Sequence, residues 1–210
     1  MNWLRMGAMA LAGALMIVVS VAPAAAGAPT DQLKGAVDGV LKILDDPSLK
    51  GRLAERRAAV RKIANEIFDF SEIAKRSLAR HWHPLSEAQR TEFVSLFADL
   101  LERSYISKIE TYGGEKIQYT AERADGDFAT VSTKIVTKNG TEVPVDYRMT
   151  KRADRWLVYD VSIEGVSLVS NYRTQFNKII QTTSYNELVS KLRNKQDELL
   201  AEDKGGKKKP

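Results

Sequence analysis

The sequence contains no cysteine and only two histidines among its 210 residues. Without cysteine the chain forms no disulfide, offers no thiolate to a metal and no thiol nucleophile, and cannot carry a lipid on an N-terminal cysteine. His81 and His83 stand two positions apart before Pro84, with no acidic cluster beside them. Because residues two apart at a helix end point in different directions, we interpret both as exposed or capping residues and expect no metal site there.

The sequence also lacks the short motifs of common nucleotide-binding and hydrolytic sites. It shows no P-loop, no dinucleotide fingerprint and no calcium loop. The stretch from Gly165 to Val169 begins like the G-x-S-x-G turn of a serine hydrolase but lacks the second glycine, so Ser167 is better explained as a helix N-cap. The aromatic residues follow core positions and do not accompany clustered basic residues, which argues against nucleic-acid binding.

The only long hydrophobic run lies at the N-terminus. Arg5 precedes an apolar run over residues 6–21, and small residues follow at 24–26. This order is typical of a cleaved secretory signal peptide, which we place at residues 1–26. The alternative, a transmembrane anchor, needs about 20 apolar residues and usually a charged stop. We therefore expect export to an extracytoplasmic space such as a bacterial periplasm.

Residues 27–200 have the composition of one globular domain. Hydrophobic residues make up 43% of the whole sequence and charged residues 28%, which is ordinary for such a domain. Residues 201–210 are rich in lysine and glycine, which predicts a solvated, disordered tail. The alternative is that the positive charge of this tail assists approach to an anionic membrane surface.

Apolar residues recur every three or four positions in six segments, which predicts six helices. Several have start signals: Asp69 or Ser71 can cap one helix, and Ser86 with Gln89 forms a capping box before the most amphipathic segment, which Gly113 closes. The predicted helices cover residues 31–44, 52–68, 69–82, 86–112, 168–180 and 184–199.

Between residues 117 and 163 the apolar period changes to two. Four alternating runs are separated by an Asp-Gly turn at 125–126, an Asn-Gly turn at 139–140 and a turn near Asp154. This pattern predicts a four-stranded antiparallel meander with one face more apolar than the other. On the last strand, the residues predicted to share that apolar side are Leu157, Tyr159, Val161 and Ile163.

The order of helices, then a meander, then helices predicts an α+β fold with helices packed on one face of the sheet. The apolar faces of the sheet and of the helices must meet each other in such a fold. They either fill a tight core or line a cavity, and the sequence periodicity is the same in both cases.

Two long stretches of the chain are similar to a known family. They are FDFSEIAKRSLARHWHPLSEAQRTEFVSLFADLLERSYISKIETY, at 68–112, and WLVYDVSIEGVSLVSNYRTQFNKII, at 156–180. Both resemble the MlaC family, also called the toluene-tolerance auxiliary family, and the resemblance extends over residues 31–200. The most specific mark is the run V-Y-D-V-x-I-E-G-V-S-L-x-x-N-Y-R-x-Q-F.

This resemblance implies a soluble periplasmic carrier of phospholipid between the outer and inner membranes. It implies an NTF2-like cone with an apolar pocket that takes acyl chains, and no cofactor apart from the bound lipid as cargo. The implied partners are an inner-membrane lipid-transport ABC complex, with a hexameric lipid-binding component, and an outer-membrane lipoprotein complex. We expect a monomer. A related branch of the family accompanies hopanoid synthesis and is an alternative.

We assign the pocket lining to the apolar face of the sheet and the stripes of two helices. Two other hypotheses remain: an NTF2-like isomerase or hydratase acting on a hydrophobic substrate, with Asp160 or Glu164 as base, and a structural or adaptor domain with a full core. Asp160 lies on the less apolar register of its strand, which favours a structural or surface role. The predicted lining residues are Phe97, Leu101, Tyr105, Val131, Val145, Tyr147, Val161, Val166, Val169 and Tyr172.

Overall fold

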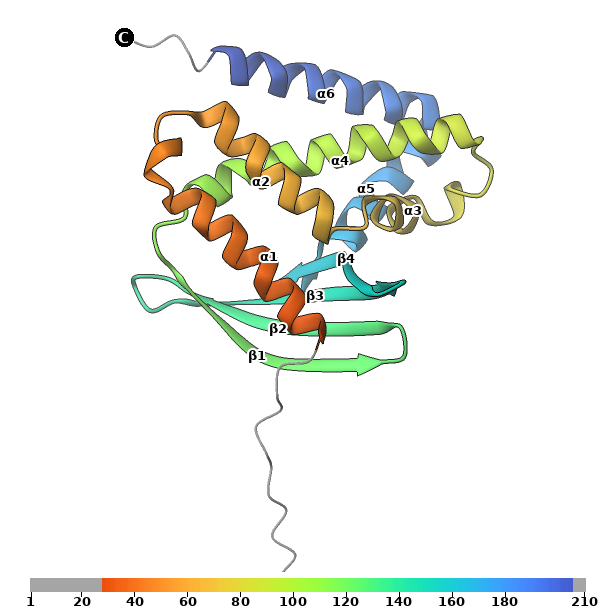
Figure 1. Ribbon diagram of the computed structural model, residues 1–210. Coiled ribbons are helices and arrows are strands. Elements are labelled where there is room, and N and C mark those ends of the chain that lie inside the picture. The colour runs from red at the N-terminus through yellow and green to blue at the C-terminus, as the bar shows by residue number, and fades with distance from the viewer. Residues whose placement is uncertain (1–27, 206–210) are drawn as a thin grey trace, which may run out of the picture.

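The computed structural model describes residues 28–205, with a sheet below a layer of helices (Figure 1). The predicted signal peptide and residues 206–210 lie outside the described residues. No helix of the described part is long and apolar enough to cross a membrane. The α-helices are α1 (Ala28–Asp45), α2 (Leu53–Ile67), α3 (Phe70–Leu78), α4 (Glu87–Glu110), α5 (Leu168–Thr182) and α6 (Tyr185–Gly205).

The predicted capping residues begin their helices as expected. Asp69 accepts a hydrogen bond from the backbone N–H of Glu72 at 2.9 Å, at the start of α3. Ser86 and Gln89 exchange side-chain to backbone hydrogen bonds of 2.9 and 3.3 Å, which is a complete capping box before α4. Helix α6 continues past residue 200 to Gly205, so the predicted tail begins later than expected.

The strands follow one another in space in the order β1-β2-β3-β4-β5, all antiparallel. The first four are the predicted meander. The fifth strand was not predicted: it has two residues and arises because Glu164 and Gly165, both with positive φ, turn the chain back onto β4. The strands are β1 (Lys116–Asp125), β2 (Phe128–Val136), β3 (Glu142–Arg152), β4 (Arg155–Ile163) and β5 (Val166–Ser167).

A β-bulge in β4 corrects the predicted face of that strand. Arg148 pairs with Asp160 and the next residue of β3 pairs with Val158, so Tyr159 is an extra residue in β4. Side chains on either side of a bulge lose the simple alternation by two. Val158 therefore shares a face with Val161, whereas Leu157 lies on the opposite face.

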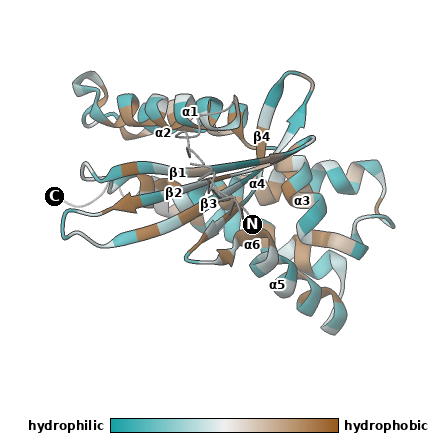
Figure 2. Ribbon diagram, turned by 90° about the horizontal axis from the view of Figure 1, so that it is seen from below, coloured by the Kyte–Doolittle hydropathy of each residue, from teal (hydrophilic) through white to brown (hydrophobic). Residues whose placement is uncertain are grey.

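Two groups of helices meet the sheet, and both contact β4. Helices α1 and α2 lie together on one side of the sheet, where α1 contacts β1, β2 and β4 and α2 contacts β4 (Figure 2). Helices α3 and α5 also contact β4. The outer edge of β4 is further occupied by Phe68, which forms a parallel bridge with Val158. The helical layer therefore continues around the β4 edge.

Candidate functional site

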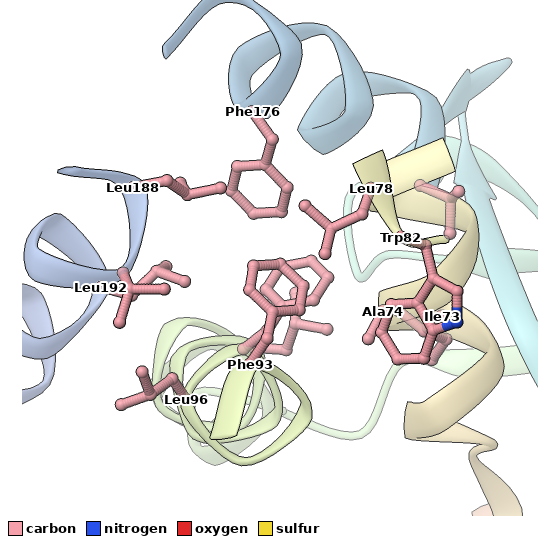
Figure 3. Packing of buried hydrophobic residues seen from close by; sticks show 13 residues of the cluster. Ile73, Ala74, Leu78, Trp82, Phe93, Leu96, Phe176, Leu188 and Leu192 are labelled. Atoms are coloured by element: carbon pink, nitrogen blue, oxygen red, sulfur yellow. The ribbon is translucent and has the colours of Figure 1, made fainter. Parts of the chain in front are cut away.

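The buried apolar residues form two separate clusters. The helical cluster joins α3, α4, α5 and α6 around Phe93 and Phe176 (Figure 3). The sheet cluster joins Leu33 of α1 and Ile67 of α2 to the covered face of β2, β3 and β4. The buried strand residues of the sheet cluster are Ala129, Val131, Met149, Trp156 and Val158.

Five of the ten predicted lining residues belong to the helical layer. Phe97 lies at the centre, with ring centroids 4.9 Å from Tyr172 and 5.0 Å from Phe176. Tyr105 and Tyr172 are only partly buried, and burial raises the pKa of both hydroxyls. The five residues are Phe97, Leu101, Tyr105, Val169 and Tyr172.

Three other predicted residues belong to the sheet layer. Val131 is fully buried in the sheet cluster, and Tyr147 and Val161 pack against it. The register explains this grouping, because Val131 pairs with Tyr147 and Tyr147 pairs with Val161 across β2, β3 and β4. These three side chains therefore form one row on the covered face.

The last two predicted residues, Val145 and Val166, lie in contrasting places. Val145 is 3% exposed and belongs to neither cluster. Val166 is 64% exposed on the short strand β5, beside the exposed Ile163. The structure therefore does not bring Val166 together with the other predicted residues.

Val145 shares its unusual position with two residues that were not predicted to line a pocket. Val60 of α2 and Ile106 of α4 are also buried and also belong to neither cluster. Among the described residues, α4 packs closely against α2, α3 and α6 but makes no comparably extensive backbone contact with a strand. Val60, Ile106 and Val145 are therefore buried by contacts outside the two clusters. Ile106 was missed because it stands next to the apolar stripe of its helix and not on it.

Ion pairs hold the second half of α4 against α2. Arg57 donates two hydrogen bonds to Glu110, at 2.9 and 3.0 Å, and Arg61 lies 2.5 Å from Glu102. Burial raises the pKa of Glu102, and the neighbouring Arg61 opposes this shift. These ion pairs join this side of α4 to α2.

Asp160, the candidate base, is a structural residue in this fold. It is 3% exposed and accepts hydrogen bonds from Ser167 Oγ at 2.6 Å, Val169 N at 3.0 Å and Arg148 at 3.3 Å. Ser167 in turn accepts from the backbone N–H of Ser170, as predicted for the N-cap of α5. Asp160 thus fixes the start of α5 on β4; of the two expected roles it has the structural one, and it does not lie at the surface.

The second candidate base, Glu164, lies on an exposed turn with φ of 50°. In the described part of the chain no three histidine or acidic side chains are grouped to hold a metal ion. His81 contacts Asn177 at 3.0 Å. Asp160 and His81 therefore make contacts that join separate elements of the fold.

Replacing Asp160 by asparagine should lower the free energy of unfolding by about 2 kcal/mol, because the amide group loses charge-assisted bonds to Ser167 and Arg148. Urea denaturation at neutral pH measures the loss. The matched control is Asp146→Asn, a partly buried carboxylate on the same face of the sheet, which should change stability by less than about 0.5 kcal/mol. Equal effects of the two changes would contradict the anchoring role of Asp160.

Two curated proteins are similar to this chain. The intermembrane phospholipid transport system binding protein MlaC of Haemophilus influenzae is 27% identical over 120 residues, which is 55% of this chain and 56% of that protein. The toluene tolerance protein ttg2D of Pseudomonas putida is 25% identical over 125 residues, 59% of this chain and 58% of that protein. The aligned part therefore spans little more than half the length of these relatives.

A solved structure is similar over a larger part of the chain. It is a phospholipid-binding protein from Ralstonia solanacearum in complex with a phospholipid, with a TM-score of 0.74 and 28% identity. The match covers 83% of this chain and 99% of that structure. The sequence profile of the MlaC protein family also matches residues 34–194. The family match spans the helices and the sheet together, and the chain therefore belongs to the MlaC protein family.

Proposed function

We propose that this protein is a phospholipid carrier that buries acyl chains between its helical layer and its sheet. The observation that carries the proposal is the likeness to a structure solved with a bound phospholipid, which extends over nearly all of that structure. The buried apolar faces of the sheet and of the helices support it from within this chain.

The physical requirement of such a carrier fits the side chains. A phospholipid has roughly thirty methylene groups, and each costs about 0.8 kcal/mol in water, so free transfer would cost on the order of 20 kcal/mol. A carrier must replace this water contact with apolar contact. It needs no converging polar groups, which agrees with the structural roles of Asp160 and His81.

We further propose that the ten predicted lining residues act as two walls. The sheet wall is formed by Val131, Val145, Tyr147 and Val161, and the helical wall by the five residues of α4 and α5. Val166 would lie at the rim, given its exposure. Acyl chains would enter between α4 and the sheet, because the helical cluster and the sheet cluster remain separate there.

The site of action and the partners are part of the same proposal. The printed name of the Haemophilus influenzae relative places that protein in an intermembrane transport system. For this chain we propose a periplasmic location, an inner-membrane ABC complex and an outer-membrane lipoprotein complex as partners, and a monomeric carrier. Catalysis is not proposed, because Asp160 is engaged by three donors.

Lipid extraction and native mass spectrometry of the protein purified from its host test the carrier. We expect close to one phospholipid per chain. The same measurement identifies a hopanoid if the protein belongs to that branch. A protein that carries no lipid, and that takes up none from vesicles, would overturn the proposal and favour a structural domain with a full core.

A further inference from the structure

Three hydroxyl groups lie together on the otherwise apolar covered face of the sheet. Tyr119 of β1 pairs with Thr133 of β2, and Thr133 pairs with Val145 of β3. Tyr147, two residues further along β3 and on the same face, is the diagonal neighbour of Thr133. Thr133 itself donates to the backbone carbonyl of Val145 at 3.1 Å.

Tyr119 differs from the other two because its hydroxyl has no partner. The oxygen is buried, and no hydrogen-bonding group of the described residues reaches it. Native proteins leave few buried polar atoms in this state, since an unmade hydrogen bond costs free energy. The phenol therefore has a free donor that faces the region between the sheet and the helices.

The surroundings of Tyr119 restrict what it can bind. Burial raises the pKa of Tyr119, and the nearby Tyr147 and Asp38 raise it further, so the phenol stays protonated and donates. Asp38 of α1 is paired with Lys34 at 2.5 Å and so presents no unpaired charge to a ligand. Tyr119 packs against the apolar sheet cluster, where a phosphate or a free fatty-acid anion would have to give up its hydration. A neutral acceptor such as an ester carbonyl has a much smaller desolvation cost.

We infer that Tyr119 is a lipid-contacting residue whose hydroxyl donates to an ester carbonyl of an acylglycerol lipid, next to the Thr133–Tyr147 pair. The inference rests on the proposed function and deepens it, because it identifies the ester carbonyl as the lipid group that the protein recognises inside the apolar site. Acyl chains alone would bind by size, whereas this contact selects ester-linked lipids over ether-linked lipids and fixes the depth of the glycerol.

A competition experiment tests this contact. Delipidated full-length mature protein is equilibrated with vesicles that hold equal amounts of diacyl and dialkyl-ether phosphatidylglycerol of the same chain length. Native mass spectrometry then gives the ratio of the two lipids retained. We expect the wild type to prefer the ester by roughly fivefold, the worth of one hydrogen bond, and Tyr119→Phe to take both lipids equally.

Tyr185→Phe is the matched control. The Tyr185 hydroxyl donates to the carbonyl of Gln89 at 3.1 Å in the helical layer, so this variant should keep the ester preference and melt at a lower temperature. Tyr119→Phe should melt no lower than the wild type, because its hydroxyl gives up no bond within the protein.

The outcomes separate the inference from the proposed function. If the wild type takes up no phospholipid at all, the carrier itself is wrong. If the wild type takes up both lipids equally, the proposed carrier function is kept and the Tyr119 contact is wrong. This is the result expected if an enclosed water molecule accepts the hydrogen bond of the Tyr119 hydroxyl. An ester preference that persists in Tyr119→Phe also overturns the contact.

Discussion

Replacing Val145 by arginine should reduce the bound phospholipid at least tenfold while leaving the protein folded. Val145 is 3% exposed and belongs to neither buried cluster, and we propose that it lines the lipid site on the sheet wall. A charge placed there must be solvated, and a long arginine reaches outward while its stem stays on the apolar wall. The acyl chains of the lipid then lose part of the apolar contact that would otherwise replace their contact with water. Lipid occupancy by native mass spectrometry and a thermal melt measure both parts of the prediction.

Val158→Arg is the matched control for this change. Val158 is fully buried within the sheet cluster, on the same covered face of the sheet as Val145, and is not among the proposed lining residues. Arginine at this position has no route to solvent and should unfold the protein. If Val145→Arg unfolds it as well, Val145 fills a core. If Val145→Arg folds and keeps its lipid, Val145 does not line the site.

Replacing Phe93 by alanine should cost about 3–5 kcal/mol of the free energy of unfolding, the range for truncating a buried aromatic ring. Phe93 is fully buried, and its ring lies 5.7 Å from Phe97, 5.6 Å from Phe176 and 6.3 Å from Tyr185 between centroids. Truncation leaves a cavity at the junction of α4, α5 and α6, where three rings lose their shared neighbour (Figure 3). Urea denaturation monitored by circular dichroism gives the difference.

Phe128→Ala is the corresponding control, because Phe128 is 50% exposed and contacts mainly the ring of Tyr159. Its truncation should cost less than about 1 kcal/mol. A loss at Phe93 as small as that at Phe128 would mean that the helical cluster does not determine stability.

Much of the local structure follows from the sequence. The capping boxes and the three- to four-residue apolar spacing depend on neighbours within one or two turns, so Ser86, Asp69 and Ser167 begin the helices expected of them. The Asp-Gly and Asn-Gly turns set the order of the first four strands in the same way. The family resemblance further anticipated the fold and the profile match.

Only the tertiary structure decided which apolar residues meet. Periodicity predicts which face of a helix or strand is apolar, but not which other element covers that face. In the structure the buried apolar residues form two clusters, because α4 makes its main contacts with other helices and not with the sheet. The bulge at Tyr159 moved Leu157 to the opposite face, since one extra residue shifts the alternation beyond it. Asp160 became buried for a similar reason: the docking of α5 brings three donors to it. Contacts between distant segments, and not local preference, therefore created both the anchor at Asp160 and the division of the buried apolar residues into two clusters.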